Sequence, residues 1–295
     1  IVFGDWSSDV CSSDLLSLPK ILETIIFDGM DMRTGGRIFP AHGRKLESWD
    51  EIRETFKDYF RRACHVLTLT NNIQHDAWRK ISPSLVNSLL KPDCLKTGKD
   101  IGSMGCRYNT TFNIESCGTA NLINSLAALK HNIFTEKKYT LEEYRKAILD
   151  NFGYHTAGET GSFSLMDQVP AAHFTQYQKI HRDSLNAPKF GNDNHFVDEI
   201  MTQWEEWFCE MTHDYRSLYD QPMYACQISV STHGPMGAVT LAGPDGRLCG
   251  TTFSDGSVSA YPGTDRNGPY ALFNSATCWN QDRKSTRLNS SHRIR

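Results

Sequence analysis

Two side chains of this 295-residue chain have the type and the setting for acid–base or binding chemistry. The first is Glu115, the only carboxylate between Asp100 and Glu136, in the short apolar run Phe112-Asn-Ile-Glu-Ser-Cys-Gly118. Such a run before a glycine is typical of a strand that ends in a tight turn. A carboxylate inside a protein is expected to have a raised pKa and can act as a base near neutral pH. The alternative is an exposed glutamate at the end of a strand.

His233 is the second candidate, as a substrate-binding side chain in the segment Ser231-Thr-His-Gly-Pro235. A histidine beside glycine and proline can equally hold a turn in place. Two histidine–aspartate neighbours, His75-Asp76 and His213-Asp214, are typical of surface or helix-cap arrangements rather than of catalytic dyads. The sequence therefore points to Glu115 for catalysis and to His233 for substrate contact.

Several widespread catalytic patterns are missing. The sequence contains no GxGxxG, GxxxxGKS/T, GxSxG or HExxH pattern, so nucleotide-binding proteins, serine hydrolases and zinc proteases have no motif support. Between residues 16 and 281 there are eight cysteines, none in a CxxC pair, and their spacing matches no zinc or iron–sulfur framework. We therefore predict no bound metal and expect most of these thiols to be small core residues.

Helical periodicity predicts the elements that must position these candidates. The apolar run from Leu16 to Phe27 is helix-like and stops at Asp28-Gly29. Ser48 and Glu51 form a capping box that begins a long helix with one apolar face. The apolar face of that helix consists of Ile52, Phe56, Phe60, Cys64 and Leu67.

Three further helices are predicted along the chain. They cover 121–134, then the segment from the Thr140–Glu143 capping box to about Gly153, and 197–213 with its many aromatic residues. Residues 96–103 are expected to be a loop, and residues 161–188 have weak periodicity and are expected to be irregular. Residues 226–232 alternate like a strand. Helices that alternate with short strands favour an α/β fold.

The two ends of the chain carry related peptides. Residues 5–15 are DWSSDVCSSDL and residues 282–292 are DRKSTRLNSSH. For one choice of codons, the DNA that encodes the first peptide is the reverse complement of DNA that encodes the second. Unrelated polar tails would not show this relation, so we expect residues 1–15 and 282–295 to be translated sequencing adapter. Residues 16–281 would then be the native part, and Cys11 would have no biological role.

Residues 16–281 contain 26 basic and 30 acidic side chains, a net charge of −4. A mildly acidic surface argues against nucleic acid or an anionic membrane as the main partner. No apolar run approaches the length of a membrane span, and no signal peptide is visible. We therefore expect a cytoplasmic protein.

Glycine-rich segments occur in a fixed order along the chain. Their Asp-Gly and Asn-Asp steps form turns, and turns at the rim of a barrel can build an active site. The segments are Lys96-Thr-Gly-Lys-Asp100, Gly105-Cys-Arg-Tyr-Asn109, Phe190-Gly-Asn-Asp193, Gly243-Pro-Asp-Gly-Arg247, Phe253-Ser-Asp-Gly256 and Gly263-Thr-Asp-Arg-Asn-Gly-Pro269. Over nearly all of residues 16–281, this order resembles the pyruvate formate-lyase family of glycyl radical enzymes.

The resemblance implies a fold and also what this chain lacks. Members of the family have a ten-stranded α/β barrel, with a Gly-Cys-x-Glu loop for the catalytic cysteine and a C-terminal Arg-Val-x-Gly loop for the radical glycine. The segment 16–23 resembles the helix just after the cysteine loop, and Gln281 precedes the glycine loop. Cys106 falls at a variable position of its segment, so it does not match the catalytic thiol. We expect a partial barrel without either radical residue, inactive as it stands.

Within the family, the chain resembles the arylacetate decarboxylases most, through residues 65–80, 105–109 and Pro222-Met-Tyr-Ala-Cys226. In that subgroup a glutamate beyond the cysteine loop binds the phenol of 4-hydroxyphenylacetate and accepts its proton, and Glu115 is the matching candidate. The resemblance implies radical decarboxylation of an arylacetate. A thiyl radical activates the carboxylate, CO2 leaves, and the benzylic radical recovers hydrogen from the cysteine.

The resemblance also implies partners for the intact, anaerobic enzyme. These are an S-adenosylmethionine-dependent activating enzyme with an iron–sulfur cluster, a small iron–sulfur subunit and further copies of the enzyme itself. Three alternatives stay open: another glycyl radical enzyme (formate acetyltransferase-like, dehydratase or C–N lyase), a non-catalytic barrel remnant, or a fragment without function that is only an assembly product. A partial barrel would leave strand edges and apolar faces uncovered, so we expect the chain alone to be unstable or to aggregate.

Overall fold

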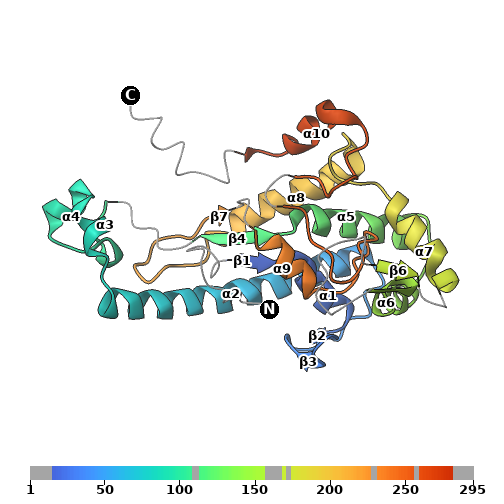
Figure 1. The fold of residues 1–295 in the computed structure, drawn as a ribbon, viewed down its shortest axis with the longest axis horizontal. Coiled ribbons are helices and arrows are strands. Elements are labelled where there is room, and N and C mark those ends of the chain that lie inside the picture. Colours follow the sequence, from blue (N-terminus) through green and yellow to red (C-terminus); the bar gives the residue numbers. More distant parts are fainter. Residues whose placement is uncertain are drawn as a thin grey trace.

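The computed structural model describes residues 15–107, 113–156, 168–170, 174–226, 231–255 and 259–281, which form a mixed α/β fold that is mostly helical (Figure 1). The helices are α1 (Leu18–Ile26), α2 (Trp49–Ile81), α3 (Leu85–Leu89), α4 (Pro92–Thr97), α5 (Thr119–Leu129), α6 (Leu141–Leu149), α7 (Phe174–Asn186), α8 (His195–Thr212), α9 (His233–Ala238) and α10 (Gly268–Ala276). The strands are β1 (Leu15–Ser17), β2 (Met30–Asp31), β3 (Gly36–Arg37), β4 (Ile114–Cys117), β5 (Tyr154–Thr156), β6 (Gln168–Pro170) and β7 (Ala225–Cys226).

Three short parallel strands from distant parts of the chain form the central sheet, in the order β1-β4-β7. Parallel strands need crossover connections, and α1 and α5 follow directly after β1 and β4. β2 pairs with β3 and β5 with β6, each as a separate antiparallel ribbon. The parallel sheet with its helices confirms the predicted α/β class.

The two faces of the central sheet have different neighbours. Successive side chains of a strand point to opposite faces. Leu16 and Ile114 belong to the main apolar core, whereas Leu15 and Cys117 belong to a second, smaller cluster. Because apolar groups cover the sheet on both faces, its short strands are buried like those of an α/β barrel.

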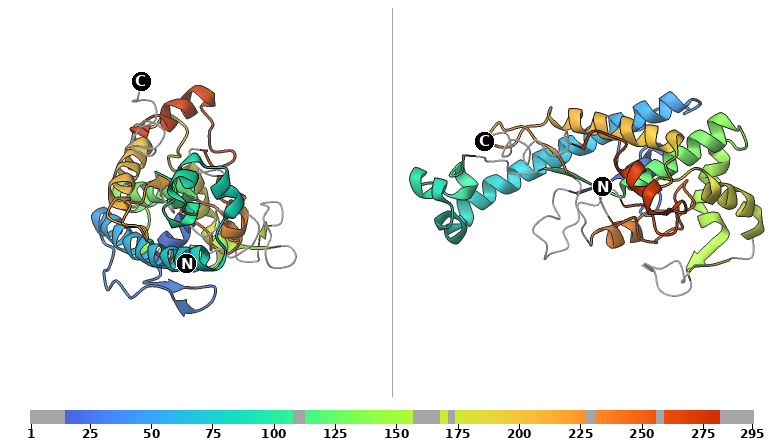
Figure 2. Two further views of the ribbon diagram at one scale, coloured as in Figure 1. Left: turned by 90° about the vertical axis from the view of Figure 1, so that its left-hand side faces the viewer. Right: turned by 90° about the horizontal axis from the view of Figure 1, so that it is seen from above.

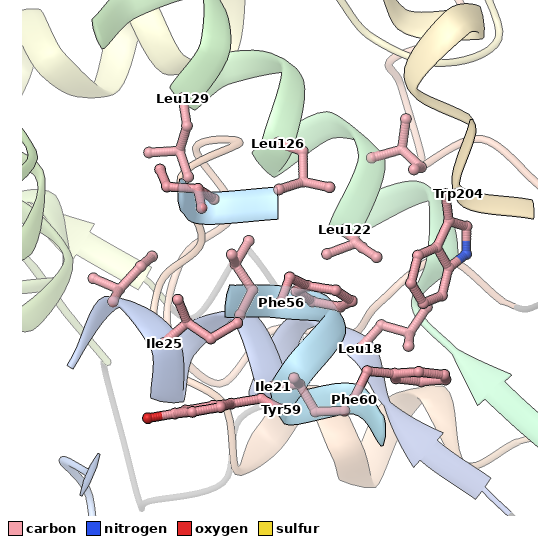
Figure 3. Packing of buried hydrophobic residues seen from close by; sticks show 14 of the residues in the cluster. Leu18, Ile21, Ile25, Phe56, Tyr59, Phe60, Leu122, Leu126, Leu129 and Trp204 are labelled. Atoms are coloured by element: carbon pink, nitrogen blue, oxygen red, sulfur yellow. The ribbon is translucent and has the colours of Figure 1, made fainter. Parts of the chain in front are cut away.

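The main core is built from α1, α2, α5 and α8, whose side chains converge in Figure 3. The ring of Phe60 on α2 meets Trp204 of α8 edge-on, with centroids 5.1 Å apart, and Phe208 at 5.4 Å. Edge-on contacts of this kind add to the burial of the rings. The apolar faces that the periodicity predicted for these helices are therefore confirmed.

Both predicted capping boxes are present and begin their helices as expected. The Ser48 hydroxyl accepts from the amide of Glu51 at the start of α2. The Thr140 hydroxyl does the same for Glu143 at the start of α6. Each pair satisfies amide groups that the first turn of a helix leaves without an internal acceptor.

Four element predictions need correction. Ser231 and Thr232, the last residues of the 226–232 strand prediction, form a turn before α9. The first residues of the predicted 16–27 helix form strand β1, because an apolar run of this length suits a buried strand as well as a helix. Residues 174–186, expected to be irregular, form α7. The expected 96–103 loop includes the end of α4 and a 3-10 helix, Ile101–Ser103.

Some predictions concern residues beyond those described. They include the strand prediction for 227–230, the segment 161–167 and both peptides assigned to adapter, apart from Leu15, which begins β1. The boundaries 1–15, 16–281 and 282–295 therefore stay predictions. Among the described helices, none combines the length and the apolar character that crossing a bilayer requires.

The long helix α2 extends well beyond the core. Its buried side chains end at Asn71, although the helix continues to Ile81. At this far end, α3 and α4 pack together as a small lobe, away from the central sheet (Figure 2). We call residues 84–107 the distal lobe.

The buried Lys189 makes the stability of the fold sensitive to pH. Its ammonium donates to the Ser184 carbonyl oxygen at 2.5 Å, and burial lowers its pKa to about 8. Between about pH 8 and 10.5 the unfolded chain therefore binds more protons than the folded one, so stability must rise with pH in this window. We expect the gain attributable to this group to be roughly 3 kcal/mol.

Urea unfolding of the chain and of its Lys189→Met variant at several pH values checks this prediction. Methionine fills a similar volume without a charge, so the variant should be more stable than the parent at pH 7.5. That advantage should shrink as the pH approaches 10. A difference that stays constant over the range would contradict the lowered pKa.

Candidate functional site

Glu115 lies in the middle strand of the sheet and is only 5% exposed. β4 runs into Gly118, which has a φ of 78°. A Cβ atom at this glycine would lie 2.8 Å from the ring of Pro19. Only glycine allows this turn at such close approach. The predicted strand and its glycine turn are confirmed, and the alternative of an exposed glutamate is wrong.

The register of the sheet defines which residues surround Glu115. It is paired with Leu15 of β1 and with Cys226 of β7. Partners in parallel strands point to the same face, as does Cys117, two residues further along β4. We call the face that carries Leu15, Glu115, Cys117 and Cys226 the inner face. It lies opposite the side chains that join the main helical core.

Cys117 gives the inner face an uncharged thiol. It packs with Leu15, Met236 and Phe253, and burial raises its pKa to about 12. The side chain of Thr232, which interacts with the thiol, opposes this shift. At neutral pH the thiol is therefore protonated. Its packing with Met236 brings α9 onto the same face as Glu115.

His233 is the first residue of α9 and is half-buried. Its carbonyl oxygen accepts from the amide of Phe253 at 3.3 Å. Four residues further on, a Cβ atom at Gly237 would lie 2.3 Å from the Thr251 carbonyl oxygen. α9 therefore packs closely against residues 251–253, which place Phe253 on the inner face. The structure brings the helix of His233 to the same face as Glu115.

A buried arginine organises the segment that follows α9. Arg247 is 3% exposed, and its guanidinium donates to the carbonyl oxygens of Thr251 (2.6 Å), Leu248 (3.1 Å) and Leu241. Its charge also lies 4.8 Å from the centre of the Phe253 ring. These contacts fold 241–253 around one cation and direct Phe253 toward Cys117.

Polar side chains of α5 fix three of the glycine-rich segments. The Asn121 amide accepts from the Ser254 amide at 2.8 Å and donates to Asp245 at 3.0 Å. Asn124 accepts from the amide of Phe190 at 2.8 Å. The segments at 190–193, 243–247 and 253–256 therefore meet on the helix that follows β4. Gly256 itself lies outside the described residues.

Charged residues of α1 hold the same region from the other side. The Lys20 ammonium lies 2.7 Å from Glu23 and 2.8 Å from Asp31, and all three are buried. The second oxygen of Glu23 accepts from the amide of Leu241 at 2.9 Å. Burial raises the pKa of Glu23, and Lys20 opposes that shift. This group ties the segment after α9 to α1.

The two histidine–aspartate neighbours take part in other contacts. Asp76 pairs with Arg79 and Lys80 one turn further along α2, and the ring of His213 stands edge-on to Tyr224. Within the described parts of the chain, no three His, Cys, Asp or Glu side chains are grouped so that they could hold a metal ion.

A family model described as pyruvate formate lyase-like matches residues 9–237. The chain belongs to the pyruvate formate lyase-like family. It is 52% identical over 263 residues to the 4-hydroxyphenylacetate decarboxylase glycyl radical subunit of Clostridioides difficile (strain 630), covering 89% of this chain and 29% of that protein. It is 37% identical over 258 residues to indoleacetate decarboxylase of Tractidigestivibacter scatoligenes, covering 87% and 29%.

A solved structure shows the same fold. A structure from work on 1,2-propanediol dehydration in Roseburia inulinivorans superposes with a TM-score of 0.81 at 28% identity, covering 92% of this chain and 32% of that one. The likeness to such pyruvate formate lyase-like proteins confirms the predicted partial α/β barrel. The chain spans about three tenths of the length of the curated relatives it matches.

Sequence reasoning selected Glu115 but missed the residues that surround it. Cys117 was counted only among thiols that are mostly expected in the core, although its spacing from Glu115 in a strand already placed both on one face. Phe253 and Arg247 were noticed as members of glycine-rich segments only. Their contacts link segments far apart in the chain, which spacing alone does not reveal.

The raised pKa of Cys117 predicts a slow reaction with iodoacetamide. A thiol pKa of about 12 instead of 9.0 leaves roughly a thousandfold less thiolate at pH 8, and only the thiolate reacts. Mass spectrometry of the tryptic peptide 108–130 measures labelling over time. Cys106, which is half-buried, serves as the internal comparison.

Urea provides the control for this measurement. In the unfolded chain Cys117 and Cys106 should be labelled at similar rates, because both thiols are then exposed to water. If Cys117 reacted as fast as Cys106 in the folded chain, the burial of Cys117 on the inner face would be refuted.

Proposed function

We propose that this chain supplies part of the barrel wall of a glycyl radical lyase that decarboxylates an arylacetate such as 4-hydroxyphenylacetate. The observation that carries the proposal is the position of Glu115, buried on the inner face of β4. The identity of 52% to the glycyl radical subunit of a 4-hydroxyphenylacetate decarboxylase supports the substrate class. The activity is that of the complete protein.

In this proposal Glu115 binds the hydroxyl group of the substrate ring and accepts its proton. A carboxylate is an acceptor only, and its hydrogen bond with a phenol is short and strong when water is excluded. The neighbouring groups of the inner face, Leu15 and the neutral thiol of Cys117, add no competing charge. An indole N–H is also a donor on an aromatic ring, and it could donate to the same Glu115 carboxylate.

His233 is proposed as a second substrate contact, close to the inner face at the start of α9. Its helix is held against Phe253, which packs on Cys117. An imidazole N–H can donate a hydrogen bond to a carboxylate, so it suits the acid group of an arylacetate.

The complete enzyme needs components beyond these residues. A glycyl radical supplies the one-electron chemistry when it is installed by an S-adenosylmethionine-dependent activating enzyme. We propose this activating enzyme and a small iron–sulfur subunit as partners of the complete protein, consistent with the naming of the relative as a glycyl radical subunit. The residues of this chain bind the substrate, orient it and move its phenolic proton.

A dehydratase is the second candidate, because a structure from work on 1,2-propanediol dehydration superposes closely on this chain. Its sequence identity of 28% is well below the 52% to the decarboxylase subunit. A small diol also has no aromatic ring to place against a buried wall. Decarboxylation is therefore favoured, and substrate tests distinguish the two.

The decisive experiment is Glu115→Gln in the complete, radical-bearing enzyme that contains this chain. Glutamine keeps the size and can still form a hydrogen bond, but it cannot accept a proton. We expect turnover of 4-hydroxyphenylacetate to fall by at least about a hundredfold. The glycyl radical content, measured by electron paramagnetic resonance, should stay the same and show that the barrel is intact.

Glu136→Gln is the matched control, because Glu136 is the next carboxylate along the chain and is exposed. It should leave turnover unchanged. Normal turnover by the Glu115→Gln enzyme would remove Glu115 from the site. Conversion of a diol but of no arylacetate by the unmodified enzyme would instead establish the dehydratase.

A further inference from the structure

A pair of cysteines in the distal lobe lies outside the proposed active site. Cys94 belongs to α4, and Cys106 follows the 3-10 helix Ile101–Ser103. Their sulfur atoms are 3.5 Å apart, and neither cysteine takes part in a disulfide. Cys94 is 3% exposed, whereas Cys106 is half-buried and open to a small reagent.

The loop between the two cysteines is held so that the sulfur atoms meet. A Cβ atom at Gly105 would lie 2.8 Å from the Cys94 sulfur and 2.4 Å from the Lys99 carbonyl oxygen, so only glycine permits this approach. The Thr97 hydroxyl donates to the Gly105 carbonyl oxygen at 3.0 Å. The contact between the thiols is therefore fixed by the backbone on both sides.

An ion pair beside the two cysteines joins the same two segments. The Arg107 guanidinium donates to the Asp93 carboxylate at 3.2 Å. Each residue of this ion pair adjoins one of the cysteines, so the ion pair and the thiol contact join the same two segments. Two sulfur atoms held in this way need only a small movement to form a bond.

We propose that Cys94 and Cys106 form a reversible dithiol–disulfide site, oxidised by a low-molecular-weight disulfide such as oxidised glutathione. The Cys106 thiolate attacks one sulfur of the reagent and releases the first thiolate. The Cys94 thiolate then attacks the Cys106 sulfur of the mixed disulfide and releases the second. Two protein thiols are oxidised, the reagent is reduced to two thiols, and the two protons pass to those products.

The order of attack follows from the surroundings of the two thiols. Desolvation, together with the neighbouring Cys106 thiol, raises the pKa of Cys94. In the mixed disulfide, Cys106 is no longer a thiol. It therefore no longer raises the pKa of Cys94 in the way that the neighbouring thiol does. The described residues offer no grouped ligands that would make this pair a metal site instead.

When the disulfide forms, it would link α4 covalently to the loop before β4, and reduction would break this link. The bond would close a short ring within the distal lobe, which lies away from the inner face (Figures 1 and 2). The proposal therefore does not depend on the proposed catalytic function.

Peptide mapping of the whole chain tests the proposal. After treatment with oxidised glutathione, free thiols are blocked and the chain is digested with trypsin. Cys94 and Cys106 fall in the separate peptides 81–96 and 100–107. We expect these two peptides joined by a disulfide, lighter by two hydrogen atoms than the free pair, and separated again by dithiothreitol.

Two variants and one reference condition make the result decisive. Cys106→Ser should abolish the joined peptide, whereas Cys278→Ser, which removes a partly exposed thiol elsewhere, should preserve it. Oxidation in concentrated urea should give mixed pairings instead of this one. Stable mixed disulfides on Cys106, or the same mixture of pairings in the folded and unfolded chain, would overturn the proposal.

Discussion

The constraint on which the rest of this structure depends is that β4 is the middle strand of a sheet buried on both faces. Its backbone is hydrogen-bonded to β1 and β7, so neither edge is open to water. One face carries Ile114 into the helical core, and the other carries Glu115 and Cys117. Burying a carboxylate is costly unless something uses or satisfies it. The burial of Glu115 on that face is the observation on which its proposed role rests.

The cover of the inner face is built by polar interactions rather than by regular secondary structure. Residues 241–254 form no long helix or strand, and they are held by the buried guanidinium of Arg247, by Glu23 and by Asn121. Each of these groups bonds to backbone atoms, which satisfies main-chain groups that a loop would otherwise bury without partners. A buried cation surrounded by carbonyl oxygens fixes one loop conformation, because alternative packings would leave its charge unpaired. The position of Phe253 over Cys117 follows from that arrangement.

Local sequence patterns predicted those elements whose structure depends only on residues within the same segment. The capping box at Ser48 and the apolar stripe that follows it are complete within α2. α7 was missed because its buried side chains include His181 and Ser184, which weaken the apolar period. β1 was missed because two leucines and a serine before a helix give no signal of their own. Its strand structure exists through its pairing with β4, a contact that no local pattern contains.

The chemistry of the inner face also bears on how selective a site built there would be. Among the described residues of β1, β4 and β7 on this face, Glu115 is the one carboxylate, beside the aliphatic Leu15, the hydroxyl group of Ser17 and two thiols. In the proposed site, an analogue without a donor on its ring would lack the hydrogen bond that the substrate forms with the buried Glu115 carboxylate, so it would bind less well. Rejection of this kind reaches about 10⁴-fold in other enzymes, far more than the loss of a methylene contact. With the function proposed for this chain, the same glutamate that takes the proton would therefore also select the substrate.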